Sequence, residues 1–343
     1  MKKIFMTLCA AAALVACSKT EVQYENSAEI GFAPAVMNVT KAAMASGTLE
    51  LNNPTQKLGV WAYWDNGGSQ LELYFSDATF ARKTTTLTNG QSVTAWGGDN
   101  YAYPWPTNGT LTFAGYTKPT TAITAGYDVA NDNVTFTNYS PANGFDLCWF
   151  NATTPVNNRA SGAAVDVTLS HALSWLTFNI KGEGTVGWKI NNIVLNDIAG
   201  QGTATCHGTG AGAATWTCST YTTDVTLLSS ELTLTDEFVD IENDAKNILV
   251  IPQTINAGGQ ADAARTQHTL TINYSFPVGT NNWKTDTKVV KLDLTSTDAN
   301  NPIPNKWESG KHYTYNMTFK SNEILVSPSY GVWGEVQQGV TIE

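Results

Sequence analysis

The residue best placed for chemistry is Cys17, whose thiol directly follows Leu14-Val15-Ala16. Two lysines and a short apolar run, Ile4–Ala13, come before it, and the run is too short to be a stable membrane anchor. Small residues before a cysteine admit a signal peptidase, and the thiol then carries a diacylglycerol. The length of the apolar run, the two lysines and the small residues before Cys17 all favour a lipoprotein signal over an ordinary secretory signal. The sequence therefore predicts a signal peptide at residues 1–16 and lipidation at Cys17, which gives a membrane anchor.

Two later cysteines, Cys206 and Cys218, flank a loop rich in Gly and Ala with strand-like sequence on either side. In an oxidising compartment such a pair can close a hairpin with a disulfide, and the sequence leaves open whether this one does. Cys148 stands in an apolar stretch and is expected to be a buried thiol. His207 adjoins Cys206, but no further ligand follows at a recognisable spacing. We therefore predict neither a metal site nor a cofactor.

Enzyme chemistry finds little support in the residue pattern. The four histidines are isolated, and no nucleophile motif accompanies them. The acidic residues are scattered through turn-like segments without a pair suited to glycoside hydrolysis. Asp128, Asp132 and Asn133 could approach a calcium ion, but they lack the EF-hand spacing and fit a solvated turn better. We predict no catalytic residues.

Composition sets the class of protein. Charged residues make up 14% of the 343 residues, and the formal net charge is −10, which argues against nucleic acid as a partner. No segment after the signal reaches eighteen consecutive apolar residues, so no transmembrane helix is expected. Once the signal is removed, the remaining length exceeds what one hydrophobic core usually holds, which favours two domains.

Strand patterns recur at short spacing, separated by turn residues, and helical patterns are sparse. The pattern predicts an all-β chain built from two antiparallel β-sandwich domains. The clearest segments are Leu58–Trp64, Gly109–Tyr116, Val165–Ile180, Trp188–Leu195, Thr269–Phe276 and His312–Phe319.

Strand content is weakest over Asn151–Ala164, a run of Asn, Thr, Gly and Ala. We place the domain boundary there, which gives an N-terminal domain at 42–160 and a C-terminal domain at 161–326. Residues 17–41 precede the first domain, and a tail at 327–343 follows the second.

Several stretches together resemble one family, the fimbrillins or type V pilins of Bacteroidales surface fimbriae. The stretches span nearly the whole chain, in order and behind the lipidation signal. They are Glu29-Ile30-Gly31-Phe32, Tyr103-Pro104-Trp105-Pro106, Phe145-Asp146-Leu147, Leu169-Ser170-His171-Ala172, Ile248–Gln253 and Trp307–Tyr315.

The resemblance implies transthyretin-like domains and a lipidated pro-segment at 17–41 that contains a removable first strand around Ile30–Phe32. It also implies that a trypsin-like protease at the cell surface cuts between Lys41 and Ala42. The best-studied members are cut after arginine, whereas this site offers lysine. Arg82 and Lys83 form a second candidate, but a cut there would also remove the strand at Leu58–Trp64.

The tail carries a strand pattern with apolar residues on one parity, namely Val332, Val336, Val340 and Ile342. A strand of this kind offers an apolar face to alternate pockets while its backbone completes a ladder. The resemblance implies that it acts as a donor strand for another subunit. The alternative from the residues alone is that it is the last strand of its own domain.

The resemblance thus predicts a structural pilin at the outer membrane and cell surface, with other pilin subunits as partners and adhesion as its role. The surface ligand is not indicated. A chain that is not cut would remain a lipidated anchor. The rival hypothesis is a tip adhesin or glycan-binding surface lipoprotein, for which Trp61, Trp64 and Trp96 would supply stacking platforms. Core packing is the preferred interpretation of these aromatic residues.

Overall fold

The chain folds into strands and loops, and the computed structural model contains no helix within the part of the chain that it describes. Correspondingly, no helix suited to crossing a membrane occurs in that part. The described residues are 29–36, 56–86, 92–141, 145–158, 163–209, 212–241, 248–255, 268–292, 306–332 and 338–339.

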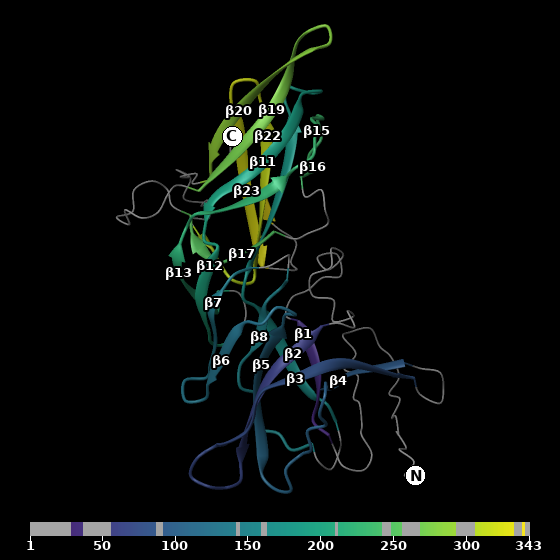
Figure 1. Ribbon diagram of the computed structural model, residues 1–343, viewed down its shortest axis with the longest axis vertical. Coiled ribbons are helices and arrows are strands. Elements are labelled where there is room, and N and C mark those ends of the chain that lie inside the picture. The colour runs from purple at the N-terminus through teal and green to yellow at the C-terminus, as the bar shows by residue number, and fades with distance from the viewer. Residues whose placement is uncertain are drawn as a thin grey trace.

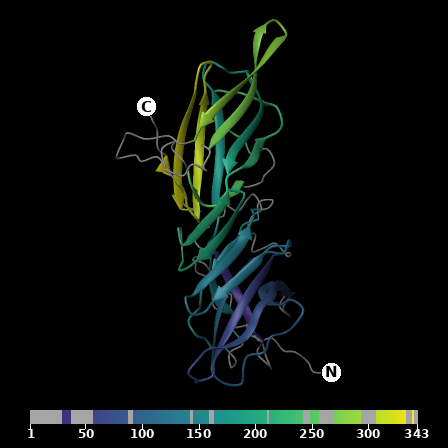
Figure 2. The same cartoon turned by 60° about the vertical axis from the view of Figure 1, so that its left-hand side comes forward.

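The molecule is elongated, with the N-terminal strands gathered at one end and the C-terminal strands at the other (Figure 1). A second view shows the same two stacked parts (Figure 2). A four-stranded sheet between them takes strands from both halves of the sequence.

The strands at the N-terminal end close into a barrel. Its order is β1 (Gly31–Val36), β4 (Ser92–Gly98), β3 (Glu72–Thr86), β2 (Lys57–Asp65), β5 (Thr110–Lys118), β8 (Cys148–Phe150) and β9 (Val165–His171).

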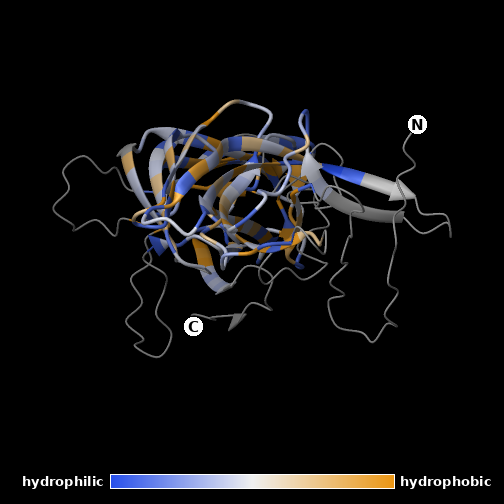
Figure 3. Cartoon of the chain, turned by 90° about the horizontal axis from the view of Figure 1, so that it is seen from below, coloured by the Kyte–Doolittle hydropathy of each residue, from blue (hydrophilic) through white to orange (hydrophobic). Residues whose placement is uncertain are grey.

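Barrel strands bury both of their faces over part of their length. In β2, Val60 and Ala62 belong to the cluster inside the barrel, whereas Trp61 between them belongs to a second cluster outside it. In β5, Phe113 points inward and Tyr116 outward in the same way. Because side chains alternate along a strand, two buried faces require a second layer over the barrel wall. Figure 3 shows hydrophobic and hydrophilic positions alternating along the strands.

A four-stranded sheet provides that second layer, in the order β13 (Ala214–Thr220), β12 (Gln201–Cys206), β7 (Asn133–Tyr139) and β6 (Thr124–Asp128). Strand β7 precedes residue 160 and β12 follows it, yet they pair directly, for example Phe136 with Ala204. Strand β9 also follows residue 160 and pairs with β1 and β8 in the barrel. The limits 42–160 and 161–326 stay a prediction, because hydrogen-bonded strands cross that point of the sequence.

The C-terminal end contains two packed sheets. One has the order β14 (Thr223–Leu228), β11 (Lys189–Ile198), β19 (Thr269–Gly279) and β20 (Asn282–Lys291), with β15 (Leu232–Thr233) also on β11. The other has the order β16 (Val239–Asp240), β10 (Ser174–Gly182), β22 (Lys311–Phe319), β23 (Ile324–Val332) and β24 (Gln338–Gly339), with β17 (Ile248–Val250) also on β10. A short ladder joins β18 (Gln253–Thr254) to β21 (Lys306–Trp307).

The core between these sheets follows the sequence alternation. Along β22, Tyr313, Tyr315, Met317 and Phe319 are buried, while the residues between them are partly exposed. The indole nitrogen of Trp307 donates to the Tyr315 hydroxyl at 2.8 Å, so these two buried polar groups are paired with each other. The predicted wet and buried faces of this strand are confirmed.

The all-β class is therefore confirmed, with two departures from simple antiparallel sandwiches. The N-terminal end is a closed barrel with a covering sheet. In addition, β1 pairs with β9 and β10 pairs with β22 in parallel, whereas the other described pairings are antiparallel. Parallel partners need long crossover connections, so strand patterns in the sequence could not indicate them.

One partly buried histidine on the other face of β22 makes the stability of the fold depend on pH. The ring of His312 stacks on Trp175 with centroids 3.6 Å apart, and its Nε2 lies 2.9 Å from the Thr177 hydroxyl. Burial lowers the pKa of His312 from 6.5 to about 3. The unfolded chain thus binds a proton between these values while the folded chain does not, so stability falls as the pH drops through that window.

We expect His312→Gln to lose part of the pH dependence of folding. Unfolding by denaturant, measured for both proteins at about pH 7 and pH 5, should show the wild type losing about 2 kcal/mol more than the variant. The variant should be less stable at neutral pH, because it also loses the stacking contact. Equal losses in the two proteins would show that His312 titrates normally in the fold.

Candidate strand-exchange groove

Strand β1 closes the barrel, and it comes from the segment before the other barrel strands. On one side it pairs in parallel with β9, from Phe32 opposite Val165 to Val36 opposite Leu169. On the other side it pairs with β4, where Phe32 lies opposite Trp96. Without β1, both β4 and β9 would present an unpaired edge, and the barrel would be open between them.

Two side chains anchor this segment in the barrel core. Ile30 and Phe32 are fully buried. The Phe32 ring meets Phe80 and Phe113 edge to face, with centroids 4.8 and 5.1 Å away. The backbone nitrogen of Ile30 donates to the Tyr103 carbonyl at 2.7 Å. The segment therefore fills two pockets spaced two residues apart, the spacing at which one face of a strand repeats.

The strand beside β1 carries an apolar face on the inside of the barrel. Val165, Val167 and Leu169 of β9 are buried in the same cluster as Phe32, whereas Asp166 and Thr168 between them are exposed. Any strand that replaced β1 would meet this alternation. It would need apolar residues on one parity and a free backbone for the ladder with β9.

The predicted processing residues lie outside the described residues. These are the lipidation site Cys17 and the cleavage pair Lys41 and Ala42, so their assignments stay predictions. The rival cleavage pair can be placed: Arg82 and Lys83 lie within β3 and pair with Trp96 and Ala95 of β4. Proteases need a segment that can be drawn out of the fold, and a strand paired at these positions is a poor substrate. This placement favours Lys41 over the second candidate.

The tail can be followed only in part. Val332 is the last residue of β23 and pairs with Lys311 of β22. Val336, Val340 and Ile342 lie outside the described residues. The short strand β24 turns back onto β23, with Gly339 opposite Ser329. The described part of the tail thus lies on an edge of its own subunit, and its predicted donor role stays a prediction.

The disulfide between Cys206 and Cys218 is not formed, and the strand register gives the reason. Both residues lie in the β12–β13 hairpin, but Cys206 pairs with Ala214 and Cys218 pairs with Gly202. Four residues of strand separate the two positions, about 13 Å of rise. A disulfide needs Cα atoms within about 7 Å, so this register does not allow the bond that the sequence left open.

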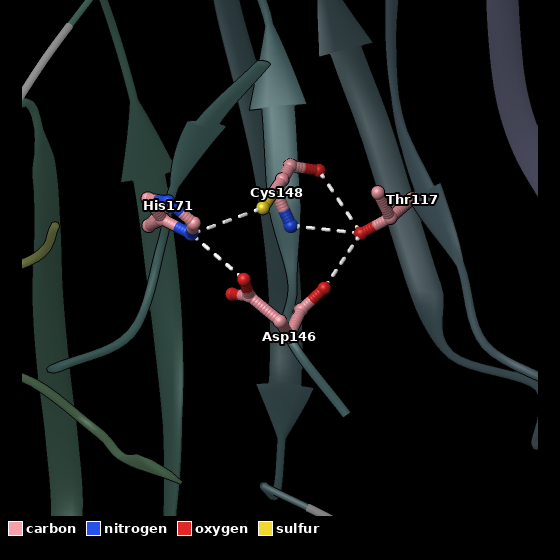
Figure 4. A network of polar contacts seen from close by, with 4 residues as sticks. All are labelled: Thr117, Asp146, Cys148 and His171. Carbon is pink, nitrogen blue, oxygen red and sulfur yellow. Dashed lines mark hydrogen bonds and ion pairs between the residues drawn. The ribbon is translucent and has the colours of Figure 1, made fainter. Parts of the chain in front are cut away.

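The sequence patterns also failed to show that Asp146, Cys148 and His171 meet. The His171 Nδ1 lies 2.7 Å from a carboxylate oxygen of Asp146 and 3.4 Å from the Cys148 sulfur (Figure 4). All three side chains are buried. A signal existed, because the motifs Phe145-Asp146-Leu147 and Leu169-Ser170-His171-Ala172 each contribute one member, but their meeting required the β8–β9 pairing.

This cluster lacks the geometry of a catalytic triad. In a triad one imidazole nitrogen faces the nucleophile and the other faces the acid, whereas here Nδ1 faces both Cys148 and Asp146. Burial, and the nearby Asp146 carboxylate, raise the pKa of the Cys148 thiol well above 9, which disfavours the reactive thiolate. The arrangement offers no activated nucleophile.

The aromatic residues considered as sugar platforms are mostly core residues. Trp61 and Trp96 are buried in the clusters outside and inside the barrel. Trp64 is partly buried, and its indole nitrogen donates to the Asn108 carbonyl at 2.9 Å. The candidate calcium loop is also accounted for: Asp128 caps the backbone nitrogens of Ala130 and Asn131, as a polar turn does.

The cysteine placement predicts an order of reactivity. Cys218 is partly exposed, whereas Cys148 and Cys206 are buried. In a chain that begins at Ser18, a bulky maleimide should therefore label the native protein at Cys218 first, and label Cys148, Cys206 and Cys218 in denaturant without a reducing agent. Mass spectrometry of the labelled peptides measures this. The variant Cys218→Ser should show little native labelling, and a Cys206–Cys218 peptide that resists labelling until reduced would contradict the register.

Three solved structures show what the chain is similar to. A fimbrial protein from Bacteroides vulgatus shares 18% identity at a TM-score of 0.55, over 88% of this chain and 99% of the other. A candidate cell adhesion protein from Bacteroides ovatus shares 12% sequence identity at a TM-score of 0.50, over 90% of this chain and 99% of the other. The tip fimbrial protein Mfa3 from Porphyromonas gingivalis, truncated at its C-terminus, shares 10% sequence identity at a TM-score of 0.41, over 81% of this chain and 94% of the other.

A search of curated proteins returned no match. The family model described as fimbrillin-like matches residues 40–333, which is most of the chain. The match runs through the barrel, the covering sheet and the C-terminal sheets, and it leaves out the residues before 40, which include Cys17 and β1, and the tail after residue 333. The chain belongs to the fimbrillin-like family.

Proposed function

We propose that this protein is a structural, non-enzymatic subunit of a cell-surface fimbria that serves adhesion. It is exported as a lipoprotein precursor anchored to the outer membrane through Cys17. A trypsin-like protease cuts it between Lys41 and Ala42, which releases the segment that carries β1. The tail of another subunit then occupies the vacated place, and repetition of this step builds the polymer.

The observation that supports this proposal most is the position of β1. This strand closes the barrel, pairs with β4 and β9 on its two sides, and belongs to the segment before Lys41. A cut in the intervening chain, residues 37–55, would separate β1 from the rest of the barrel. The remaining groove would then have an apolar floor and two unpaired edges, which is an unstable surface in water unless a new strand covers it.

The tail has the features that such a groove requires. Ile30 and Phe32 occupy pockets two residues apart, and Val340 and Ile342 of the tail have the same spacing. Each aliphatic side chain that is buried stabilises the junction by about 1.5–3 kcal/mol, before the cost of ordering the strand. Val332 and Val336 share their parity, so a longer apolar face is available for the junction.

The partners on this account are other pilin subunits, of the same or an accessory kind. A chain that stays uncut would keep its lipid and β1, and could serve only as the membrane-bound end of a fimbria. Trp61 and Trp96 are buried and Trp64 is partly buried, so these three residues do not form the exposed stacking platform that the glycan-binding alternative assigned to them.

Limited trypsin treatment of the purified chain tests the proposal. We expect a new N-terminus at Ala42 by sequencing, followed by a ladder of oligomers on size analysis. Lys41→Gln should abolish both, because trypsin needs the basic side chain. Lys19→Gln, the same change within the same segment, should leave both intact.

A chain that ends at Tyr330 separates cutting from polymerisation. It should be cut at Lys41 but remain monomeric, because it lacks the four apolar tail residues. Two results would contradict the proposal: a chain that is cut, keeps its tail and stays monomeric, or a ladder from the chain that ends at Tyr330.

A further inference from the structure

We propose that Asp146, Cys148 and His171 form a zinc-binding site inside the protein, between β8 and β9. This inference does not depend on the proposed function, and it concerns a cluster that strand exchange does not use. The sequence predicted no metal site because the two ends of the cluster stand 25 residues apart.

The backbone brings the ligand atoms together. Cys148 of β8 lies directly opposite His171 of β9, and Asp146 stands two residues before Cys148, on the same side of the extended chain. One ligand atom from each residue lies within 4.8 Å of the other two. Figure 4 shows the imidazole, the sulfur and the carboxylate converging on one point between the strands.

The donor set suits zinc. Thiolate sulfur, imidazole nitrogen and carboxylate oxygen are its usual protein ligands. On a tetrahedral zinc, ligand atoms lie roughly 3.3–3.7 Å apart, given bond lengths of about 2.0 Å to nitrogen and 2.3 Å to sulfur. The sulfur of Cys148 and the Nδ1 of His171 are already 3.4 Å apart. The carboxylate oxygen of Asp146 lies 2.7 Å from Nδ1, so it has to move away from the imidazole by roughly 1 Å or less to reach the ligand spacing of a tetrahedral zinc.

The same carboxylate has a second oxygen that the imidazole does not use. Oδ2 of Asp146 faces the imidazole, while Oδ1 is buried and has no hydrogen-bond partner in the part of the chain that the structure describes. A buried carboxylate oxygen without a partner is costly, since it loses its hydration and gains nothing in return. A zinc ion beside this carboxylate would compensate its charge and reduce this cost, and a water molecule can take the fourth position, as it does in zinc sites with three protein ligands.

Charge also favours a divalent cation at this depth. A thiolate and a carboxylate together carry two negative charges, which Zn²⁺ neutralises, and the imidazole is neutral as a ligand. The bound site is therefore uncharged overall, as a buried site should be. On binding, Zn²⁺ takes the place of the thiol proton of Cys148, which passes to the solvent.

A buried threonine holds Cys148 of β8 and the preceding Asp146 in place. The Thr117 hydroxyl accepts a hydrogen bond from the Cys148 nitrogen at 2.8 Å and donates to the Asp146 carbonyl at 3.0 Å. These bonds act on the backbone of the ligands and leave their side chains available. Fixed ligands favour metal binding, because little ordering remains to be done.

Refolding with metal tests the site, since all three ligands are buried and zinc would enter before the barrel closes. The purified chain is unfolded, refolded with zinc chloride, washed with a weak chelator and analysed for metal. We expect one zinc per chain. Refolding with Co²⁺ should give the thiolate-to-cobalt absorption in the near ultraviolet and the visible bands of a tetrahedral ion.

Two matched variants assign the signal. Cys148→Ser should lose the thiolate band and retain about tenfold less metal, or lower still. Cys206→Ser makes the same change at the other buried cysteine and should keep both. The wild type decides the matter even if Cys148→Ser does not fold. A wild-type chain without a thiolate band overturns the proposal, and so does a folded Cys148→Ser that retains as much zinc.

Discussion

The constraint on which the rest of the structure depends is the closure of the barrel by β1. A sheet that curls into a barrel has no free edge only when its first and last strands meet, and here β1 stands between β4 and β9. The strand is held by backbone pairing and by Ile30 and Phe32 in the core, with no covalent tie other than the chain itself. Closure thus depends on a segment near the N-terminus, ahead of the region that the family model matches.

The middle of the molecule joins the two ends through a core that β1 does not enter. The covering sheet draws β6 and β7 from one part of the sequence and β12 and β13 from another, and it buries the outer face of β2 and β5. Trp61, Tyr116 and Phe136 lie in this layer, while Phe32 lies in the separate cluster inside the barrel. Two independent cores share one wall, so loss of β1 would disturb the inner core and leave the contact between the two ends in place.

Local patterns predicted the strands that are buried on one or both faces, such as β22, β5 and β2. The residue types of each strand alone are enough to indicate these strands. The first strand was expected near Ile30–Phe32 from a family resemblance, and the structure places β1 there. The pairing of strands far apart in the sequence could not be predicted from these patterns. The parallel contact of β1 with β9, the offset between Cys206 and Cys218, and the meeting of Asp146 with His171 all depend on strand register, which single-strand patterns do not contain.

The most direct test of the central claim is hydrogen exchange of β9, comparing the intact chain with one that begins at Ala42. If β1 closes the barrel, the amides of β9 that face it should exchange faster in the shorter chain, while those of β22 in the C-terminal sheet stay protected. A peptide of residues 332–343 should restore the protection of β9. Equal protection of β9 in both chains, without any peptide, would contradict the account, because the barrel would then remain closed without its first strand.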